Sequence, residues 1–202
     1  MKHSNDLNLD ASVIDRLSAF CEMVAKWTRT VNLIAPNDCD QLWDRHIADS
    51  LQLIPLMSQN LEDAADLGSG GGFPGLVLAV ATGRHFHLVE SDARKATFLK
   101  EASRTVGAST TIHQCRIEAA ILPPVGVITA RALAPLTQLI ALALPHMGRH
   151  TVLLAPKGAK AADELTIARK HWRMMVRSVP SQTDPRATIF HLSEIEQAPP
   201  DA

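Results

Sequence analysis

The chain has 202 residues, of which 46% are hydrophobic and 20% charged; this predicts one globular domain with a sizeable core and excludes a wholly disordered chain. Its formal net charge of −1 counts mildly against a protein that coats nucleic acid with its whole surface. No apolar run of membrane-spanning length, no N-terminal signal core and three cysteines without a CxxC pair lead us to expect a cytoplasmic protein with neither disulfides nor a zinc site.

Apolar residues at helical spacing mark the first part of the chain. They recur from Val13 to Val31, with Asp10 or Ser12 as the expected N-cap, and a second helical stretch follows from about Asp40 to Met57. We therefore expect residues 1–60 to form an all-helical N-terminal extension that caps the rest of the same domain and contacts the substrate.

The pattern changes after residue 60, where short strand-like runs alternate with helices. We expect strands at 64–67, 85–89, 110–113, 125–130, 151–155, 174–179 and 188–192, and helices near 74–82, 94–106, 116–121, 135–147 and 159–172. Such alternation is typical of a parallel sheet with helices on both faces. Residues 180–187 are too few for a crossover helix, so the last two strands should pair antiparallel. Residues 61–196 are thus predicted to form an α/β domain, and 197–202 a frayed tail.

The most informative segment is Asp66-Leu-Gly-Ser-Gly-Gly-Gly-Phe-Pro-Gly75, which follows a strand and opens a helix. Gly68, Gly70 and Gly72 permit a tight turn and a close approach to a ligand, and the next helix presents free N–H groups. Glu90 ends the second strand 22 residues after Gly68, where a carboxylate can accept both hydroxyl protons of a ribose. The segment therefore predicts a nucleotide-like cofactor at the carboxyl end of the first strand.

Two details distinguish between candidate cofactors. The run from Gly70 to Gly75 matches GxGxxG, so a nicotinamide cofactor has to be considered. Asp66, however, stands two residues before the first glycine; its carboxylate suits a ligand with a cationic amine and a sulfonium, and it would repel a pyrophosphate. Phe73 and Pro74 also make the start of the helix bulky. S-adenosylmethionine therefore fits better than NAD.

Several segments together resemble one known family, the bacterial 16S rRNA (guanine-N7)-methyltransferases called RsmG or GidB. The similar segments are NLIAP (32–36), WDRHIADSLQL (43–53), DLGSGGGFPG (66–75), LVESDARKATFL (88–99), CRIEAA (115–120), VITARALAPL (127–136) and LLAPKG (153–158). The resemblance covers residues 20 to 192, and the order of the segments makes it far more specific than the glycine loop alone.

The resemblance implies a Rossmann-like S-adenosylmethionine-dependent methyltransferase fold with a helical N-terminal extension. It implies S-adenosylmethionine as the methyl donor, and N7 of guanosine 527 in the 530 loop of 16S rRNA as the target. It places Gly68 and Phe73 in the cofactor loop, Ile117 and Glu118 on the adenine side, and Arg131 beside the cofactor and the reaction centre.

The sequence departs from the family pattern at three places. The glycine loop reads GSGGGFPG, where GTGPGLPG-like versions also occur, and this change removes no needed group. Glu90 stands where aspartate is common, which gives a longer reach to the same ribose. The last strand, 188–192, lacks the basic finish common in the family, and this puts an RNA contact there in doubt.

The residues agree with methyl transfer to guanine N7, which carries a free lone pair and needs no general base. The segment Thr129-Ala130-Arg131-Ala132 stands where enzymes that methylate exocyclic amines carry Asn/Asp-Pro-Pro-Tyr/Phe. Arg131 stays protonated and can act only by positioning; whether it holds the cofactor carboxylate or guanine O6 is left open.

Candidate RNA-contacting residues are Arg45, His46, Lys157 and Arg131. Arg45 and His46 lie in the family-like segment 43–53 and are predicted to form a lid or an RNA contact, although Arg45 could simply pair with Asp49 four residues later. Lys157 is either a phosphate contact or a solvated turn lysine. Residues 131–177 carry eight basic side chains against two acidic ones, a candidate basic face.

Other readings remain open at this point. A small-molecule methyltransferase would share the donor, a non-catalytic ribosome- or RNA-binding module would share the fold, and an NAD-dependent oxidoreductase is a distant third. His85 and His87 alternate along one strand with no evident third ligand, so we expect no metal. The expected partner is 16S rRNA in the small ribosomal subunit, bound by a monomer without contact to a membrane.

Overall fold

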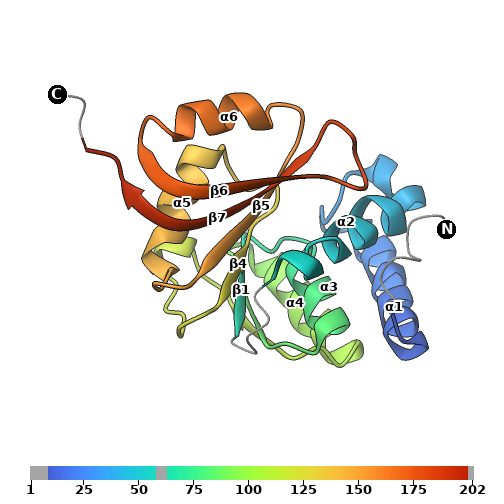
Figure 1. Ribbon diagram of the computed structural model, residues 1–202. Helices are drawn as coiled ribbons and strands as arrows, with labels where there is room; N and C mark the ends of the chain where they lie inside the picture. Colours follow the sequence, from blue (N-terminus) through green and yellow to red (C-terminus); the bar gives the residue numbers. More distant parts are fainter. Residues whose placement is uncertain (1–8, 58–62, 200–202) are drawn as a thin grey trace.

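The computed structural model describes residues 9–57 and 63–199, and its centre is a seven-stranded sheet in the order β3-β2-β1-β4-β5-β7-β6 (Figure 1). Strands from β3 through β5 in this order are parallel, whereas β7 runs antiparallel to β5 and to β6. The strands are β1 (Ala64–Leu67), β2 (Phe86–Val89), β3 (Thr110–His113), β4 (Val127–Thr129), β5 (Val152–Lys157), β6 (Trp172–Pro180) and β7 (Thr188–Gln197). The predicted α/β class and the antiparallel pairing of the last two strands are confirmed.

The last two strands are longer than their apolar patterns predicted. The run that defines β7 by sequence ends at Leu192, where pairing with β5 also begins, but backbone pairing with β6 continues to Gln197. Antiparallel hydrogen bonds need no apolar side chains, so β7 extends past its buried half and into the segment expected to fray. Residues 200–202 of that predicted tail lie outside the described residues.

Helices cover both faces of the sheet (Figure 1). On one face α3 (Gly75–Thr82) and α4 (Ala93–Thr105) pack together with α1 (Ala11–Trp27), and on the other lie α5 (Leu136–Ala143) and α6 (Ala161–Ala168). Successive strand residues point to opposite faces, so neighbours such as Ala64 and Ala65 belong to different cores.

The helix predicted near 116–121 is a single 3-10 turn, η4 (Ile117–Ala119). The chain continues from it into Pro123 and Pro124, which donate no backbone hydrogen bond and disfavour helical backbone in the residue before them. The connection between β3 and β4 is therefore short.

The second helix predicted in the extension is irregular. A 3-10 turn, η1 (Pro36–Gln41), leads into a π-helical segment, η2 (Trp43–Ala48), then α2 (Asp49–Leu51) and another 3-10 turn, η3 (Ile54–Leu56). Pro55 lies inside the last turn, where regular α-helix would require its missing N–H. Burial determines the rest, because the apolar side chains from Leu42 to Leu56 face the core in a register that one straight α-helix does not provide.

Aromatic side chains join the extension to the sheet domain. The ring of Phe20 on α1 lies 5.3 Å from that of Phe73 in the glycine-rich loop and 6.2 Å from that of Phe98 on α4, centroid to centroid. The ring of Trp27 lies 5.5 Å from that of Phe98, centroid to centroid, and packs against the same core. The Arg16 guanidinium donates to the carbonyls of Val106 and Gly107 at 2.6 and 2.8 Å. Its positive charge also stabilises the carboxyl end of the α4 dipole. The extension and the sheet domain therefore share one hydrophobic core.

Among the helices that the structure describes, none combines the length and apolar character needed to cross a bilayer.

The backbone at the start of α3 packs closely against two buried side chains, and this contact yields a test. A Cβ added to Gly75 would stand 2.5 Å from Asp66 Cβ and 2.6 Å from Leu88 Cδ2, both in buried side chains. We predict that Gly75→Ala lowers the free energy of unfolding by about 1–3 kcal/mol, because the core has to shift to admit the methyl group. The measurement is urea denaturation followed by circular dichroism.

Gly158→Ala is the matched control, since a Cβ there meets nothing within 4 Å. It should change stability by no more than about 0.5 kcal/mol. Equal effects of the two substitutions would show that the contact with Asp66 and Leu88 does not constrain the fold.

Candidate active site

The glycine-rich loop forms a tight turn between β1 and α3. Gly68, Gly70 and Gly72 have φ values of 70°, 54° and 88°, a region that side chains with a Cβ rarely adopt. The N–H groups of Gly68 and Ser69 donate to the carbonyl of Val89 at 2.9 and 3.0 Å, which fixes the loop against the end of β2. The predicted turn is confirmed; that it binds a cofactor stays a prediction.

Glu90 lies directly beside this loop. Its Oε2 accepts the N–H of Gly70 at 2.8 Å and its Oε1 accepts the N–H of Asp92 at 2.7 Å. A carboxylate offers about four lone-pair sites, so two remain for further donors. At Gly70 an added Cβ would meet nothing closer than the Gly68 carbonyl at 3.8 Å, which leaves that side of the loop open to a ligand. The arrangement fits a ribose whose hydroxyls donate to Glu90.

Asp66 lies beneath the loop rather than on its open side. It is 1% exposed, and Oδ1 accepts the Thr129 hydroxyl at 2.6 Å, whereas Oδ2 has no hydrogen-bond partner among the described residues. Burial raises the pKa of Asp66 to about 6, and the Thr129 hydrogen bond opposes this rise only in part. Its predicted contact with a cofactor amine stays a prediction.

Ile117 and Glu118 lie in the turn η4, which follows β3. This turn is at the carboxyl ends of the parallel strands, as the glycine-rich loop is. Ile117 is 8% exposed and its carbonyl accepts from His146 Nε2 at 3.0 Å, whereas the side chain of Glu118 is 58% exposed and lies 3.9 Å from Arg116. The carboxyl ends of β2 and β3 bring this turn and Glu90 to the same side of the sheet, as the cofactor prediction requires.

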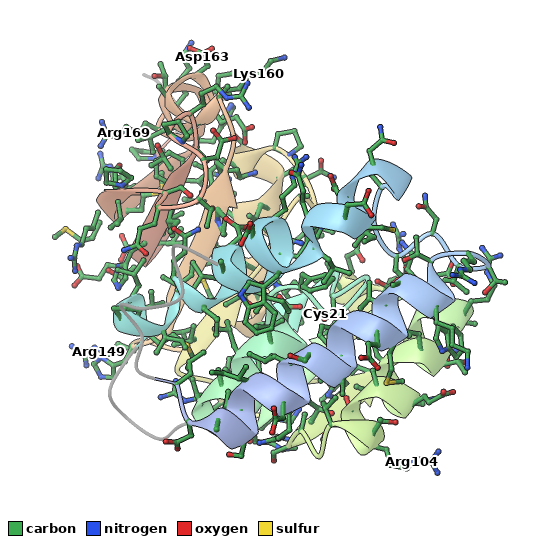
Figure 2. All side chains as sticks on the ribbon, turned by 90° about the vertical axis from the view of Figure 1, so that its right-hand side faces the viewer. Cys21, Arg104, Arg149, Lys160, Asp163 and Arg169 are labelled. Carbon is green, nitrogen blue, oxygen red and sulfur yellow. The ribbon has the colours of Figure 1, made fainter. Side chains whose placement is uncertain are left out.

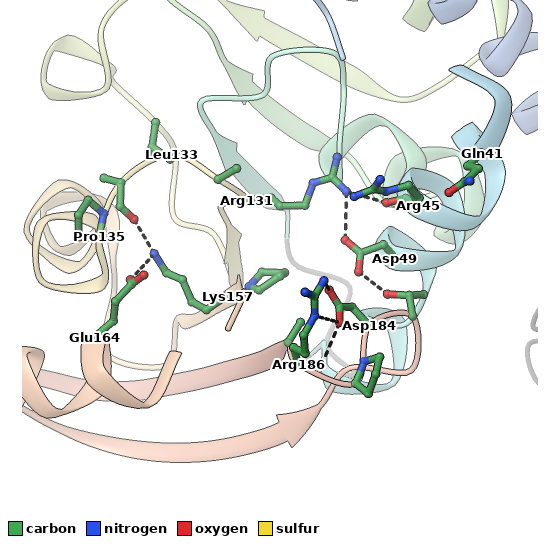
Figure 3. A pocket seen from close by; sticks show the side chains of 17 residues that line it. Gln41, Arg45, Asp49, Arg131, Leu133, Pro135, Lys157, Glu164, Asp184 and Arg186 are labelled. Carbon is green, nitrogen blue, oxygen red and sulfur yellow. Dashed lines mark hydrogen bonds and ion pairs between the residues drawn. The ribbon is translucent and has the colours of Figure 1, made fainter. Parts of the chain in front are cut away.

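Arg131 follows β4 and is held by residues from distant parts of the chain (Figure 3). Its Nη1 donates to Asp49 Oδ2 at 3.0 Å, and Nη2 lies 2.7 Å from His46 Nδ1. Its guanidinium carbon stands 5.3 Å from the centre of the Phe73 ring, within cation–π range. The structure therefore brings together Arg131, Phe73 and His46, three residues predicted to belong to the site.

His46 is neutral in this arrangement. Burial and, second, the nearby charge of Arg131 lower the pKa of His46 to about 4, whereas Asp38 and Asp49 act in the opposite direction. The Nδ1 atom of a neutral imidazole can accept a hydrogen bond from Arg131. The ring of His46 also lies 4.8 Å from that of Phe73, centroid to centroid. His46 thus serves as a partner of Arg131.

Asp49 connects the site to the hairpin between β6 and β7, and sequence reasoning did not single it out as a site residue. Besides Arg131, it accepts hydrogen bonds from Gln52 Nε2 and Thr183 Oγ1, each at 2.7 Å. Gln52 in turn accepts the backbone N–H of Gln182 at 2.8 Å. The family-like segment 43–53 contains Asp49, but nothing in the sequence indicated that Thr183 would reach it.

The spacing of Arg45 and Asp49 allowed an ion pair between them, but Arg45 pairs with Asp38 instead. Arg45 Nη1 lies 2.9 Å from Asp38 Oδ1, and its carbonyl accepts a 3.3 Å hydrogen bond from Arg131. The π-helical winding of Trp43–Ala48 has more residues per turn than an α-helix, so the alignment expected at i and i+4 is lost. The Arg45 side chain remains 58% exposed.

A pocket of about 730 Å³ opens beside Arg131 (Figure 3). It lies between the extension, the segments that follow β4 and β5, and the hairpin between β6 and β7. Its lining consists of Gln41, Arg45, Asp49, 131–135, 156–158, Glu164 and 183–187. Both signs of charge face it, and the basic groups are paired with acidic ones.

Lys157 lines this pocket but is 9% exposed. Its Nζ donates to the carbonyl of Ala134 and lies 3.0 Å from Glu164 Oε2, and the same carboxylate oxygen accepts the N–H of Leu136 at 2.8 Å. Lys157 is therefore neither a solvated turn lysine nor an unpaired cation. Its contact with an RNA phosphate stays a prediction.

Comparison with known proteins places these features in a wider group. The sequence pattern of the family described as GidB, rRNA small subunit methyltransferase G, matches residues 13–189. The chain is 49% identical over 183 residues to Ribosomal RNA small subunit methyltransferase G of Granulibacter bethesdensis, covering 91% of this chain and 86% of that protein. It is 47% identical over 182 residues to the protein of the same name from Rhodospirillum centenum, covering 90% and 84%.

Solved structures share the fold at much lower identity. A mutant of MtNAS, crystallised with S-adenosylmethionine, superposes with a TM-score of 0.60 at 13% identity, covering 98% of this chain and 86% of that one. TYW2 of M. jannaschii, crystallised with AdoMet, superposes with a TM-score of 0.56 at 11% identity, covering 76% of each chain.

The buried Asp66 carboxyl yields a pH-dependent test. An unfolded chain ionises this group near pH 4, whereas the folded chain ionises it near pH 6. The folded state is therefore penalised progressively as the pH rises through this window. We predict that the stability of Asp66→Asn relative to the parent increases by up to about 3 kcal/mol between pH 4 and pH 7, at about 1.4 kcal/mol per pKa unit.

The measurement is urea denaturation of both proteins across this range, with Asp15→Asn on the exposed face of α1 as the control for general charge effects. A stability difference between Asp66→Asn and the parent that stays constant with pH would contradict the prediction.

Proposed function

The chain belongs to the family of rRNA small subunit methyltransferase G, and from this premise we propose that it methylates N7 of guanosine 527 in 16S rRNA with S-adenosylmethionine as donor. The proposed substrate is the 530 loop of the small ribosomal subunit, which implies that the protein acts in the cytoplasm. We propose that a monomer suffices, because residues of one chain supply both the glycine-rich loop and the adjoining pocket.

One observation carries the proposal beyond family membership. Phe73 of the glycine-rich loop lies under the guanidinium of Arg131, and Arg131 borders the 730 Å³ pocket. A cofactor on the loop and a base in the pocket would therefore meet at Arg131. Transfer between two bound molecules depends on such alignment, because a fixed geometry removes the entropic cost of bringing them together.

The residues of the cofactor side fit S-adenosylmethionine. Glu90 has free lone pairs for the ribose hydroxyls, the loop is open at Gly70, and the orphaned Oδ2 of Asp66 adds negative potential beneath it. When bound, S-adenosylmethionine would supply an electrophilic methyl group on a sulfonium. We propose that it is held by Asp66, Gly68, Gly70, Gly72, Phe73, Glu90, Ile117, Glu118 and Arg131.

The chemistry asks little of the acid–base groups of the chain. N7 of guanine carries a free lone pair, so no proton has to leave before the methyl group arrives. A guanidinium stays protonated, so Arg131 cannot act as a base. The carboxylate of Asp49 and the neutral ring of His46 hold it in place. We therefore assign Arg131 the positioning of the reacting groups, through the cofactor carboxylate or guanine O6.

The RNA side is proposed to combine the pocket with exposed basic residues. Arg45 and His46 border Arg131, and Lys157 lines the opposite wall of the pocket. Outside it, Arg149, Lys160 and Arg169 project into solvent (Figure 2). These groups would contact the phosphate backbone while the pocket takes the base.

A direct test is transfer of radiolabelled methyl from S-adenosylmethionine to small ribosomal subunits prepared from a strain that lacks this gene. We expect label at one guanosine of the 530 loop, mapped by chemical cleavage at N7-methylguanosine. Label at another nucleotide would contradict the proposed position. No label on RNA, together with calorimetric binding of the cofactor, would favour a small-molecule substrate.

The role of Arg131 predicts a graded loss of activity. Arg131→Ala should lower kcat/KM at least about tenfold, since one charge-assisted hydrogen bond is worth about 1.4 kcal/mol or more. Asp49→Asn keeps the shape of the side chain at position 49 but removes the negative charge that fixes Arg131, so we expect a smaller loss of kcat/KM. Asp15→Asn on α1 is the control and should match the parent. Full activity of Arg131→Ala would remove Arg131 from the site.

A further inference from the structure

A cluster of metal-binding side chains lies on the sheet, outside the site described above. Asp63, His85 and His87 each place one ligand atom within 4.8 Å of the others. His87 Nε2 stands 3.2 Å from Asp63 Oδ2, and the rings of His85 and His87 lie 4.9 Å apart, centroid to centroid. We propose that these three residues bind one divalent transition-metal ion, with Zn²⁺ as the best-suited species.

The pairing of β1 and β2 creates the cluster. Parallel register places Ala64 beside Phe86 and Ala65 beside His87, so Asp63 precedes β1 at the level of His85. His85 and His87 alternate along the chain and therefore share one face of the sheet. The third ligand comes from the neighbouring strand, 22 residues before the first histidine, and for this reason no local motif announces it.

The face that carries the cluster is accessible. Residues 114–126 join β3 to β4 and are all described. Their only helical segment is the three-residue turn η4. The Asp63 side chain is 42% exposed, whereas His87 is 7% exposed. One ligand is thus anchored in the sheet and another faces solvent, which gives an ion both a fixed base and an entry path.

The ligand chemistry fits zinc. Imidazole nitrogen and carboxylate oxygen bind Zn²⁺ at about 2.0–2.2 Å, and two ligands on one tetrahedral ion stand about as far apart as His87 Nε2 and Asp63 Oδ2 do here. His85 completes the three-residue set, since one of its ring nitrogens lies within 4.8 Å of a ligand atom of each of the other two residues. A water molecule would fill the fourth position.

The surrounding groups support the ligands as metal sites require. His87 Nδ1 lies 3.0 Å from His113 Nε2, so it can donate its proton there while Nε2 binds the ion. The two ring nitrogens of His85 lie 2.8 Å from Ser109 Oγ and 3.0 Å from Thr111 Oγ1, so whichever does not bind the metal keeps a partner.

The position of the cluster points to a structural role. Asp63 precedes β1, whereas the glycine-rich loop follows it at the other end of the strand. An ion at the cluster would tie the start of β1 to β2, and binding to the folded state alone would stabilise the sheet.

The test is metal titration of the untagged full chain after removal of metals with a chelator. With Zn²⁺ we expect calorimetry to report one ion per chain bound at this site and the Tm to rise. With Co²⁺ we expect a visible spectrum of nitrogen and oxygen ligation, without the thiolate charge-transfer band that Cys21, Cys39 or Cys115 would produce.

Asp63→Asn and His85→Gln remove one ligand each at partly exposed positions, and each should weaken binding at least about tenfold and abolish the rise in Tm. His171→Gln, an exposed histidine after α6, is the matched control and should bind as the parent does. No binding by the parent, or equal binding by the parent, Asp63→Asn and His85→Gln, would overturn the proposal and leave a hydrogen-bonded chain from Asp63 through His87 to His113.

Discussion

The guanidinium of Arg131 is the group on which the arrangement of the site depends. It cannot lose its charge, so every position it occupies must supply acceptors or a ring face. Here they come from two segments: Asp49 and His46 belong to the extension, and Phe73 belongs to the glycine-rich loop. The hairpin between β6 and β7 joins through Thr183, which donates to Asp49. A half-buried cation thus holds together four parts of the chain that share no local sequence relationship.

The same contact connects the extension to the candidate site. Phe73 touches Arg131 on one side and Phe20 of α1 on another, and α1 is itself anchored to the end of α4 by Arg16. Packing of this density transmits displacements. A shift of α1 would move Phe73 and, with it, the guanidinium that borders the pocket. The helical extension therefore sets the geometry of the site while lying mostly outside it.

Local patterns were enough to predict what depends on local physics. The glycine-rich turn was predictable because positive φ values are cheap only for glycine, and β1 and β3 were predicted with the residue limits that the structure shows. The short connection between the last two strands, residues 180–187, likewise predicted their antiparallel pairing. Each of these features follows from a few consecutive residues.

What depends on distant contacts was not predictable. The hydrogen bond between Asp49 and Thr183 spans 134 positions. The sequence left the environment of Lys157 undecided, and its pairing with Glu164 is what holds this side chain in the interior. The π-helical segment follows from how the extension packs, which no helical propensity encodes. Strand β7 also lies between β5 and β6, and no local pattern specified its pairing with β5.

The ion pairs around the pocket bear on how a nearly neutral chain could hold a polyanion. Arg45 with Asp38, Arg131 with Asp49, and Lys157 with Glu164 leave the pocket balanced in charge. The other basic residues of the predicted basic stretch are exposed. Arg149 precedes β5, and five lie on or near α6 and β6: Lys160, Arg169, Lys170, Arg173 and Arg177. Attraction to phosphate would then arise at this periphery and recognition of the base at the neutral pocket. Phosphate contacts carry no sequence information, so the shape of the folded RNA and the fit of one base would have to account for most of the selectivity.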